Sequence, residues 1–268
     1  MMAPSALTAN TASIATTTRL RLLSYNIQIG AATTRLRHYV TQSWKHVLPH
    51  SAVFANLDHI ANVIRGYDIV ALQEVDAGSV RSRYINQVEY LARKAHFPHW
   101  YAQTTRNLGR FAQHSNGFLS RLQPRAVSEH RLPGKIPGRG LITMRFGSKE
   151  NPLQIMIVHL ALGRRARLRQ IAYICELIAA AEHMVLMGDF NCSLPGPEFD
   201  LLFSRTALSE PKTRLHTFPS WRPYRNIDHI LVTPSLRAGK VQALNSTYSD
   251  HLPIALELEI PESIFLSG

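Results

Sequence analysis

The chain has 268 residues, 45% of them hydrophobic, and a formal net charge of +12. This is enough for one sizeable core, and no linker or internal repeat divides the chain, so we expect a single domain from residue 19 to residue 268. No stretch approaches about 18 uninterrupted apolar residues, which argues against a membrane-spanning helix. Two cysteines exclude a disulfide framework and a cysteine-based zinc site, and they fit a reducing cytoplasm.

Residues 1–18 are rich in Ala, Ser and Thr and lack a basic start followed by an apolar run. This composition is not that of a secretory signal, and its low hydrophobicity predicts a disordered tail. The net positive charge of the chain attracts polyanions or anionic membrane surfaces, with a solvated basic face as the structural alternative.

Short apolar runs predict buried strands at residues 20–27, 68–72, 141–146, 153–160, 184–187, 227–232 and 254–260. Apolar residues recur at three- and four-residue steps from Phe54 to Ile64 and from Leu168 to Ile178, which predicts two amphipathic helices. Helices combined with many strands favour an α/β protein with sheets inside and helices outside.

Polar side chains suited to metal or phosphate chemistry stand at or just after the ends of several of these runs. They are Asn26, Glu74, His159 and Asp189. Strand ends are rigid and the loops beyond them are open to solvent, so a scaffold can aim catalytic side chains from there. A carboxylate such as Glu74 suits a hard cation such as Mg²⁺, although Glu74 alone is also compatible with a surface ion pair.

The segment Gly188-Asp189-Phe190-Asn191 alternates polar and apolar side chains. In extended backbone Asp189 and Asn191 point to the same side, while Phe190 packs inward. The carboxylate can orient or deprotonate a water molecule, and the amide can donate to a phosphate oxygen. A simple turn with side-chain-to-backbone hydrogen bonds is the structural alternative.

Two Asp-His pairs, Asp228-His229 and Asp250-His251, lie near the end of the chain. An aspartate commonly orients an imidazole and stabilises its protonated form. Adjacent residues in an extended chain point apart, so we expect Asp228, from another strand, to orient His251. Asp250 is then free to bind a metal. His159 ends an apolar strand and is a further candidate for the site. The structural alternative is a buried histidine with one hydrogen bond.

Two further residues are candidates for substrate binding. Arg167 lies one turn before Gln170 on the basic helix that follows His159, where it can present donors to a phosphate. Trp221 can stack on a base or lean into a lipid surface. The structural alternative for Arg167 is a solvated side chain on the helix surface, and for Trp221 it is packing inside the protein.

Taken in order, these motifs resemble the endonuclease/exonuclease/phosphatase superfamily, which includes deoxyribonucleases, abasic-site endonucleases, inositol-polyphosphate phosphatases and bacterial sphingomyelinases. The motifs span about residues 20 to 260, and the segment at residues 217–223 is similar to small bacterial members. They are Tyr25-Asn26-Ile27, Leu72-Gln73-Glu74-Val75, His159-Leu160, Gly188-Asp189-Phe190-Asn191, Ile227-Asp228-His229-Ile230 and Ser249-Asp250-His251. The resemblance implies a four-layered α/β sandwich, in which two mixed β-sheets face each other, helices flank them, and the site lies at one edge.

The resemblance also implies roles for the candidate residues. Glu74 would bind Mg²⁺ or Mn²⁺ beside Asn26, and Asp250 would complete the metal or water network. Asp189 would position or activate the attacking water, and Asn191 would hold a phosphate oxygen. His251, oriented by Asp228, would stabilise the charged phosphoryl group or take part in proton transfer, from the opposite side of the phosphorus to Asp189. His159 would contact the phosphate or assist the leaving group.

The implied reaction is hydrolysis of a phosphodiester by direct attack of water, with DNA or RNA favoured by the basic charge. A phospholipid head group at an anionic lipid surface is the second substrate class, followed by a small-molecule phosphate ester. A binding module that has lost catalysis is the non-enzymatic alternative. Abasic-site endonucleases carry an Asp where this chain has Gln28, which argues against abasic-site repair and a two-metal site.

Overall fold

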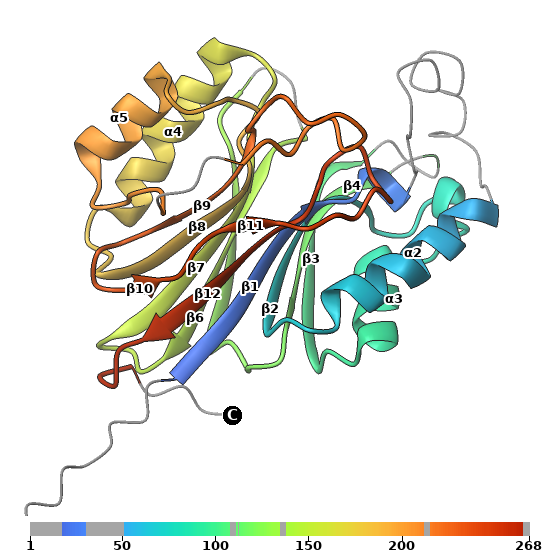
Figure 1. Cartoon of the computed structure of the whole chain (residues 1–268), viewed down its shortest axis with the longest axis horizontal. Helices are drawn as coiled ribbons and strands as arrows, with labels where there is room; N and C mark the ends of the chain where they lie inside the picture. Colours follow the sequence, from blue (N-terminus) through green and yellow to red (C-terminus); the bar gives the residue numbers. More distant parts are fainter. Residues whose placement is uncertain are drawn as a thin grey trace, which may run out of the picture.

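The computed structural model describes residues 18–30, 51–107, 111, 113–134, 138–211 and 215–264 (Figure 1). The predicted tail at residues 1–18 lies outside this range except for Thr18, which begins the first strand rather than ending the tail. No helix in the described part of the chain is both long enough and apolar enough to cross a membrane.

The first sheet has seven strands in the order β10-β12-β1-β2-β4-β3, with β11 also paired to β12. It is mixed, because β1 and β2 are parallel while the other pairs are antiparallel. Its strands are β1 (Thr18–Asn26), β2 (Ile69–Asp76), β3 (His99–Asn107), β4 (Gln113–Ser120), β10 (Arg237–Ala238), β11 (Gln242–Ala243) and β12 (Ile254–Ile260).

The second sheet has five strands in the order β5-β6-β7-β8-β9 and is also mixed, because only β7 and β8 are parallel. Its strands are β5 (Ala126–Arg131), β6 (Gly140–Gly147), β7 (Pro152–His159), β8 (His183–Asp189) and β9 (Asp228–Val232).

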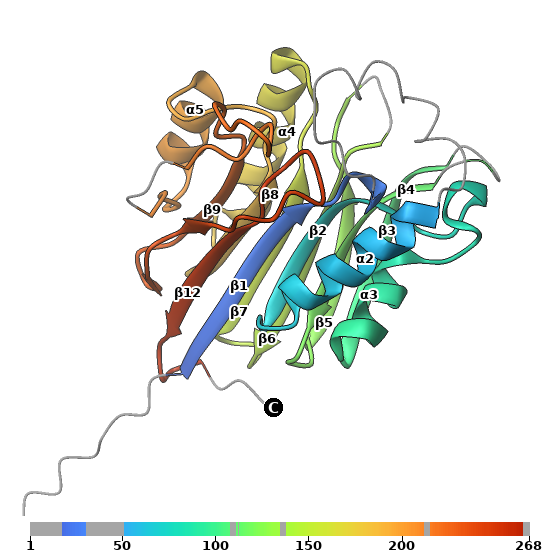
Figure 2. The same ribbon diagram turned by 45° about the vertical axis from the view of Figure 1, so that its right-hand side comes forward.

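Helices cover the outer face of each sheet. Figures 1 and 2 show α2 (Ser51–Ile64) and α3 (Gln87–Ala95) on one side of the molecule, and α4 (Arg164–Ile178) and α5 (Pro197–Arg205) on the other. Two short 3₁₀ turns, η1 (Gln28–Gly30) and η3 (Val80–Ser82), follow β1 and β2. The predicted four-layered sandwich with two facing mixed sheets is confirmed.

Three apolar layers hold the sandwich together. The central one joins the two sheets, with Leu22 and Phe118 of the first packed with Ile155 and Met187 of the second. A second layer lies between the first sheet and α2 and α3, and a third between the second sheet and α4 and α5. Each sheet is therefore apolar on both faces, which explains why its strands read as continuous apolar runs rather than alternating ones.

The predicted strands correspond to β1, β2, β6, β7, β8, β9 and β12, and the predicted helices to α2 and α4. The prediction for β2 stopped at Leu72, four residues before the strand ends at Asp76. The strands β3, β4, β5, β10 and β11 and the helices α3 and α5 were not predicted. β4 has the polar sequence QHSNGFLS, and β5 is an edge strand with no buried residue, so neither carries an apolar run.

The topology brings several strand ends to one edge of the sandwich. The carboxyl ends of β1 and β2 lie side by side, as do those of β7 and β8. β9 is antiparallel to β8, so its first residue, Asp228, pairs with the last residue of β8, Asp189. β12 is antiparallel to β1, so the segment just before Ile254 reaches the same edge. Groups far apart in sequence therefore meet there.

Candidate active site

The eight predicted site residues form one connected cluster at this edge. Asp189 is central: its Oδ2 accepts a hydrogen bond of 3.1 Å from Asn26 and lies 3.4 Å from His159 Nε2 and 3.9 Å from His251 Nε2. The remaining members reach the centre through these neighbours. They are Glu74 beside His159, Asp228 against His251, Asn191 against Asp189, and Asp250, whose carboxylate interacts electrostatically with Glu74 and His251.

Asp189 is positioned by the alternation that its motif predicts. Phe190 is fully buried and stacks on Phe199 of α5, with ring centroids 5.6 Å apart. The backbone N–H of Asn191 donates to Asp189 Oδ1 at 2.8 Å, and its side-chain Nδ2 donates to the carbonyl of Leu160 at 3.0 Å and to Asp189 Oδ2 at 3.4 Å. Both amide hydrogens are thus engaged, so Asn191 positions Asp189 here, whereas the sequence predicted that it holds a phosphate oxygen.

Gly188 fixes the approach of β8 to β7. Its φ is +146°, and a Cβ added there would lie 1.9 Å from the carbonyl oxygen of Val158. No larger residue fits that distance, so only glycine lets the parallel strands run together up to Asp189. The glycine before Asp189 is therefore a packing requirement of the catalytic edge.

His251 is held by Asp228. The Nδ1 of the ring lies 3.1 and 2.9 Å from the two carboxylate oxygens, and the hydroxyl of Thr217 donates to Asp228 Oδ2. The buried ring would by itself lose its proton, but Asp228, Asp189 and Asp250 outweigh burial and raise the pKa of His251 to about 10. The ring is therefore a cation at neutral pH, with Nε2 turned towards Asp189.

Asp189 and His251 do not lie on opposite sides of a phosphorus. The 3.9 Å between Asp189 Oδ2 and His251 Nε2 leaves no room for a phosphoryl group between them, so the predicted arrangement is wrong. Burial raises the pKa of Asp189 to about 7, and the cationic His251 partly opposes that rise. The carboxylate of Asp189 and the ring of His251 instead lie next to each other.

Glu74 owes its position to a bulge in β2. The register between β2 and β4 shifts between Leu72 and Val75, and Glu74 has a φ of +54°. A β-bulge commonly re-aims a side chain at the edge of a sheet. The side chain of Glu74 is 33% exposed, against 2% for Asp189, and its Oε1 lies 3.7 Å from His159 Nε2. Glu74 is thus the carboxylate most open to an incoming ligand.

Asp250 is tied to β1 through its neighbour Ser249. The hydroxyl of Ser249 donates to the backbone carbonyl of Asn26 at 2.7 Å and lies 3.3 Å from Asp250 Oδ1. Burial raises the pKa of Asp250 to about 6; His251 opposes the rise and Glu74 adds to it. The negative charges of Glu74 and Asp250 therefore interact unfavourably.

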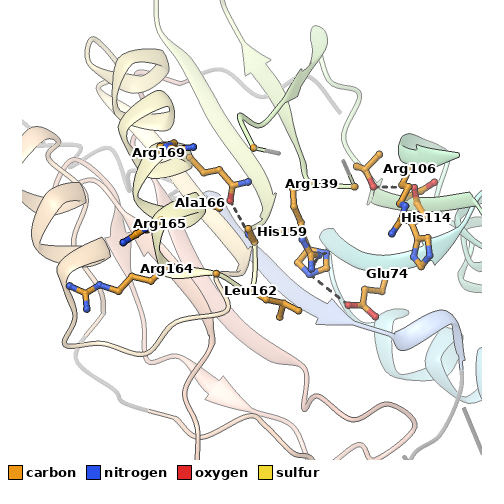
Figure 3. Close-up of a pocket in the computed structure, with 17 residues that line it drawn as sticks. Glu74, Arg106, His114, Arg139, His159, Leu162, Arg164, Arg165, Ala166 and Arg169 are labelled. Carbon is orange, nitrogen blue, oxygen red and sulfur yellow. Dashed lines mark hydrogen bonds and ion pairs between the residues drawn. The ribbon is translucent and has the colours of Figure 1, made fainter. Parts of the chain in front are cut away.

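Arg139 is a site residue that the motifs did not identify. Its Nη1 lies 2.8 Å from Nδ1 of His159 and also contacts Nε2. Burial, followed by the Arg139 charge, holds the pKa of His159 well below its ordinary value of 6.5, so the ring is neutral. Figure 3 shows Arg139 next to His159, with Glu74 beyond. No spacing in the sequence distinguishes Arg139 from the other arginines.

The donor set fits a hard divalent cation. The four carboxylates outnumber the two cationic side chains, and burial together with neighbouring carboxylates raises the pKa values of Asp189 and Asp250. Oxygen donors of this kind are those that Mg²⁺ and Mn²⁺ prefer. The groups are Glu74, Asp189, Asp228 and Asp250 against His251 and Arg139.

Two subsets of these residues compete as metal ligands. Asp189, Asp228 and His251 form the tightest group, with ligand atoms within 4.8 Å of one another. However, His251 Nδ1 is engaged by Asp228 and the ring is protonated, and a protonated imidazole does not bind a metal. Glu74 and Asp250 are then the carboxylates of the cluster that would hold a cation.

Arg167 and Trp221 lie outside the cluster. Arg167 forms an ion pair of 2.8 Å with Glu198 of α5 and donates to the carbonyls of Ala161 and Leu162. It fastens the loop after β7 to α5, which differs from the predicted substrate contact. Trp221 is half-buried in a loop fastened by the Ser220 N–H, which donates to the Asp250 carbonyl at 2.7 Å. Its contact with substrate stays a prediction.

Comparison with known proteins agrees with this geometry. A model of the Endonuclease/Exonuclease/phosphatase family matches residues 23–251. The chain is similar to a structure of a protein of that family from Bacteroides thetaiotaomicron, with 18% identity, 91% of this chain and 99% of that chain covered, and a TM-score of 0.68.

Two further solved structures are similar. One is an endonuclease/exonuclease/phosphatase from Beutenbergia cavernae, with 20% identity, 90% and 72% of the two chains covered, and a TM-score of 0.69. The other is a mannosyl-6-phosphatase from Bacteroides thetaiotaomicron, with 18% identity, 89% and 99% covered, and a TM-score of 0.65. At these identities the likeness shows the shared fold. No curated protein sequence gives a significant match.

Proposed function

The chain belongs to the endonuclease/exonuclease/phosphatase family, and we propose that it is a metal-dependent phosphodiesterase with nucleic acid as its leading substrate. Membership makes it a phosphoesterase. The finer proposal rests on one observation, which is the meeting of Asp189, the protonated His251 and the oxygen donors Glu74 and Asp250 at one edge.

Asp189 is suited to act on the attacking water. Its pKa of about 7 places it near the optimum for a general base at neutral pH. Asn26 and the backbone of Asn191 hold its two oxygens in place. A water molecule bound to this carboxylate can lose its proton as it attacks the phosphorus, without a covalent intermediate on the protein.

His251 supplies fixed positive charge for the transition state. Asp228 holds Nδ1, so the Nε2–H points towards the reaction space beside Asp189. A preorganised cation of this kind stabilises charge that develops on the phosphoryl oxygens. A bound Mg²⁺ or Mn²⁺, held by Glu74 and Asp250, would neutralise the phosphate and stabilise the leaving oxygen.

Basic charge supports nucleic acid as the substrate. The net charge is +12, and Arg106, Arg139, Arg165 and Arg169 line a pocket that also contains Glu74 and His159. Positive side chains around an active site bind the phosphate backbone and steer its approach. This arrangement favours a polyanion over a singly charged ester.

Exposed apolar side chains favour a second candidate, hydrolysis of a phospholipid head group. Tyr84, Phe111, Leu162 and Tyr224 are 64–75% exposed. Tyr84 follows β2, Leu162 follows β7, Tyr224 precedes β9 and Phe111 joins β3 to β4, so all four lie in segments at the catalytic edge. Apolar side chains around a site can enter a lipid surface, and the aromatic ones can also stack on bases.

A substrate panel distinguishes these candidates. Purified protein with Mg²⁺ or Mn²⁺ is assayed on single- and double-stranded DNA, RNA, sphingomyelin and other phospholipids, inositol phosphates, a sugar phosphate and a bis-aryl phosphodiester. We expect the highest kcat/KM on a nucleic acid. Preference for vesicles would favour the lipid candidate, preference for the sugar phosphate would favour a small-molecule phosphatase, and binding without hydrolysis would favour a binding module.

A further inference from the structure

A basic pocket of about 780 Å³ opens beside the catalytic cluster. It lies between β3 and β4, the segment before β6, and the start of α4, and Glu74 and His159 form the wall that it shares with the active site. We call it the arginine pocket and define it by Arg106, Arg139, Arg164, Arg165 and Arg169.

The pocket concentrates positive charge that the protein does not neutralise. Glu74 is the only acidic residue among the described residues that line it. Within the described part of the chain, Arg106, Arg165 and Arg169 form no ion pair. Figure 3 shows Arg106 on the wall opposite α4. Like charges held together around a cavity repel one another unless an anion lies between them.

The start of α4 adds to this field. Its first turn contains Arg164 and Arg165 and no acidic residue, and its N-cap, Gly163, provides no side-chain cap. The N-terminus of a helix has free backbone N–H groups and a positive partial charge, so arginines are normally unfavourable there. Arg164, Arg165 and Arg169 of this helix all line the pocket, and Figure 3 shows all three at the α4 side of it.

We propose that the arginine pocket binds a second phosphate group of the substrate, next to the phosphate that is hydrolysed. This inference rests on the proposed function and specifies its substrate class, an ester that carries at least two phosphates. The pocket is within the usual volume range for a small-molecule ligand, so it can hold a nucleotide-sized or sugar-sized moiety together with its phosphate. Neighbouring phosphates of a nucleic-acid strand and a small bisphosphate share this chemistry.

Binding of inorganic pyrophosphate in EDTA tests the pocket without catalysis. The pocket variant is Arg106→Gln/Arg165→Gln/Arg169→Gln. The control is Arg125→Gln/Arg145→Gln/Arg237→Gln, which removes the same charge from exposed positions outside the pocket. By calorimetry we expect the pocket variant to bind at least about tenfold more weakly than wild type, and the control within about twofold. Equal weakening in both variants would overturn the proposal.

Kinetics then identify the source of the second phosphate. With Mg²⁺, KM is measured for a bis-aryl phosphodiester, a dinucleotide with a terminal phosphate and a sugar bisphosphate. We expect the pocket variant to raise KM for one of the two-phosphate substrates about tenfold more than for the bis-aryl ester. A larger effect on the dinucleotide would identify a nucleic-acid strand as the source of the second phosphate, and a larger effect on the sugar bisphosphate would identify a small molecule.

The two hypotheses fail differently. Hydrolysis of the bis-aryl ester, with no effect of the pocket variant on pyrophosphate or on KM, overturns the pocket and leaves the proposed function standing. Pocket-dependent pyrophosphate binding, with no ester hydrolysed, supports the pocket and overturns the proposed function.

Discussion

Asp228 contacts Nδ1 of His251 with both carboxylate oxygens, at 3.1 and 2.9 Å, across the edge where β9 begins and the chain enters β12. The contact fixes the ring so that Nε2 faces Asp189. The ring is buried, and Asp228 is the first of the carboxylates that raise its pKa. Their coupling is therefore measurable in activity and in titration.

A double-mutant cycle measures the coupling in catalysis. His251→Ala should lower kcat by about 10²-fold or more with little change in KM, because it removes transition-state charge stabilisation. Asp228→Asn should act through His251, so the double variant should be little worse than His251→Ala alone. Losses of kcat that add, and that follow the loss of folded protein in melting curves, would contradict this coupling.

The titration of His251 gives a second test. Burial of the ring lowers its pKa, but the three carboxylates, Asp228 first, raise it to about 10 from the ordinary 6.5. The protonated ring therefore contributes stability that is fully present below pH 6.5 and is lost as pH rises through about 10. Asp228→Asn should shift that loss to lower pH.

NMR titration of the labelled ring in EDTA follows this shift directly, and unfolding free energies between pH 6.5 and pH 10 follow its effect on stability. The control is Asp200→Asn, an exposed position on α5. An unchanged titration midpoint in Asp228→Asn would show that the contact does not stabilise the charge.

Gly188→Ala should destabilise the fold. The added Cβ would lie 1.9 Å from the Val158 carbonyl oxygen and would force β7 and β8 apart at the residue before Asp189. We expect a loss of about 2–4 kcal/mol in denaturant unfolding. Gly66→Ala is the matched control, since its Cβ meets no atom within 4 Å. Similar stability of both variants would disprove the steric argument.

Binding of single-stranded DNA should weaken steeply with salt, because lysine and arginine displace counterions from phosphates. Each phosphate contact contributes about 0.7 to the slope of log affinity against log salt. The Arg106/Arg165/Arg169 variant should have a shallower slope than wild type, and the Arg125/Arg145/Arg237 variant the same slope. An affinity that is flat across salt concentrations would remove the basic-surface argument for nucleic acid.

The main elements of the site could be predicted because its residues stand where strands end. Asn26, His159 and Asp189 each end an apolar strand. The pairing of Asp228 with His251 followed from the rule that neighbours in an extended chain point apart. These features depend on local sequence. The order of the motifs indicated the family, and the family resemblance implied the four-layered sandwich.

The remaining features depend on contacts between distant segments. The bulge that turns Glu74 outward arises from the pairing of β2 with β4, a strand without an apolar run. Arg139 reaches His159 from the segment before β6, and Thr217 reaches Asp228 from a loop. The sequence around these residues has no periodicity, so only the assembled structure reveals their partners.

Metal dependence of phosphodiester hydrolysis tests the central claim most directly. Turnover of a bis-aryl phosphodiester is measured in Mg²⁺, in Mn²⁺ and in excess EDTA, for wild type, Glu74→Gln and the control Glu176→Gln, an exposed position on α4. We expect EDTA to abolish turnover and added cation to restore it, Glu74→Gln to lose about 10²-fold or more, and Glu176→Gln to behave as wild type. Full turnover in excess EDTA, or an unaffected Glu74→Gln variant that is folded, would contradict the account.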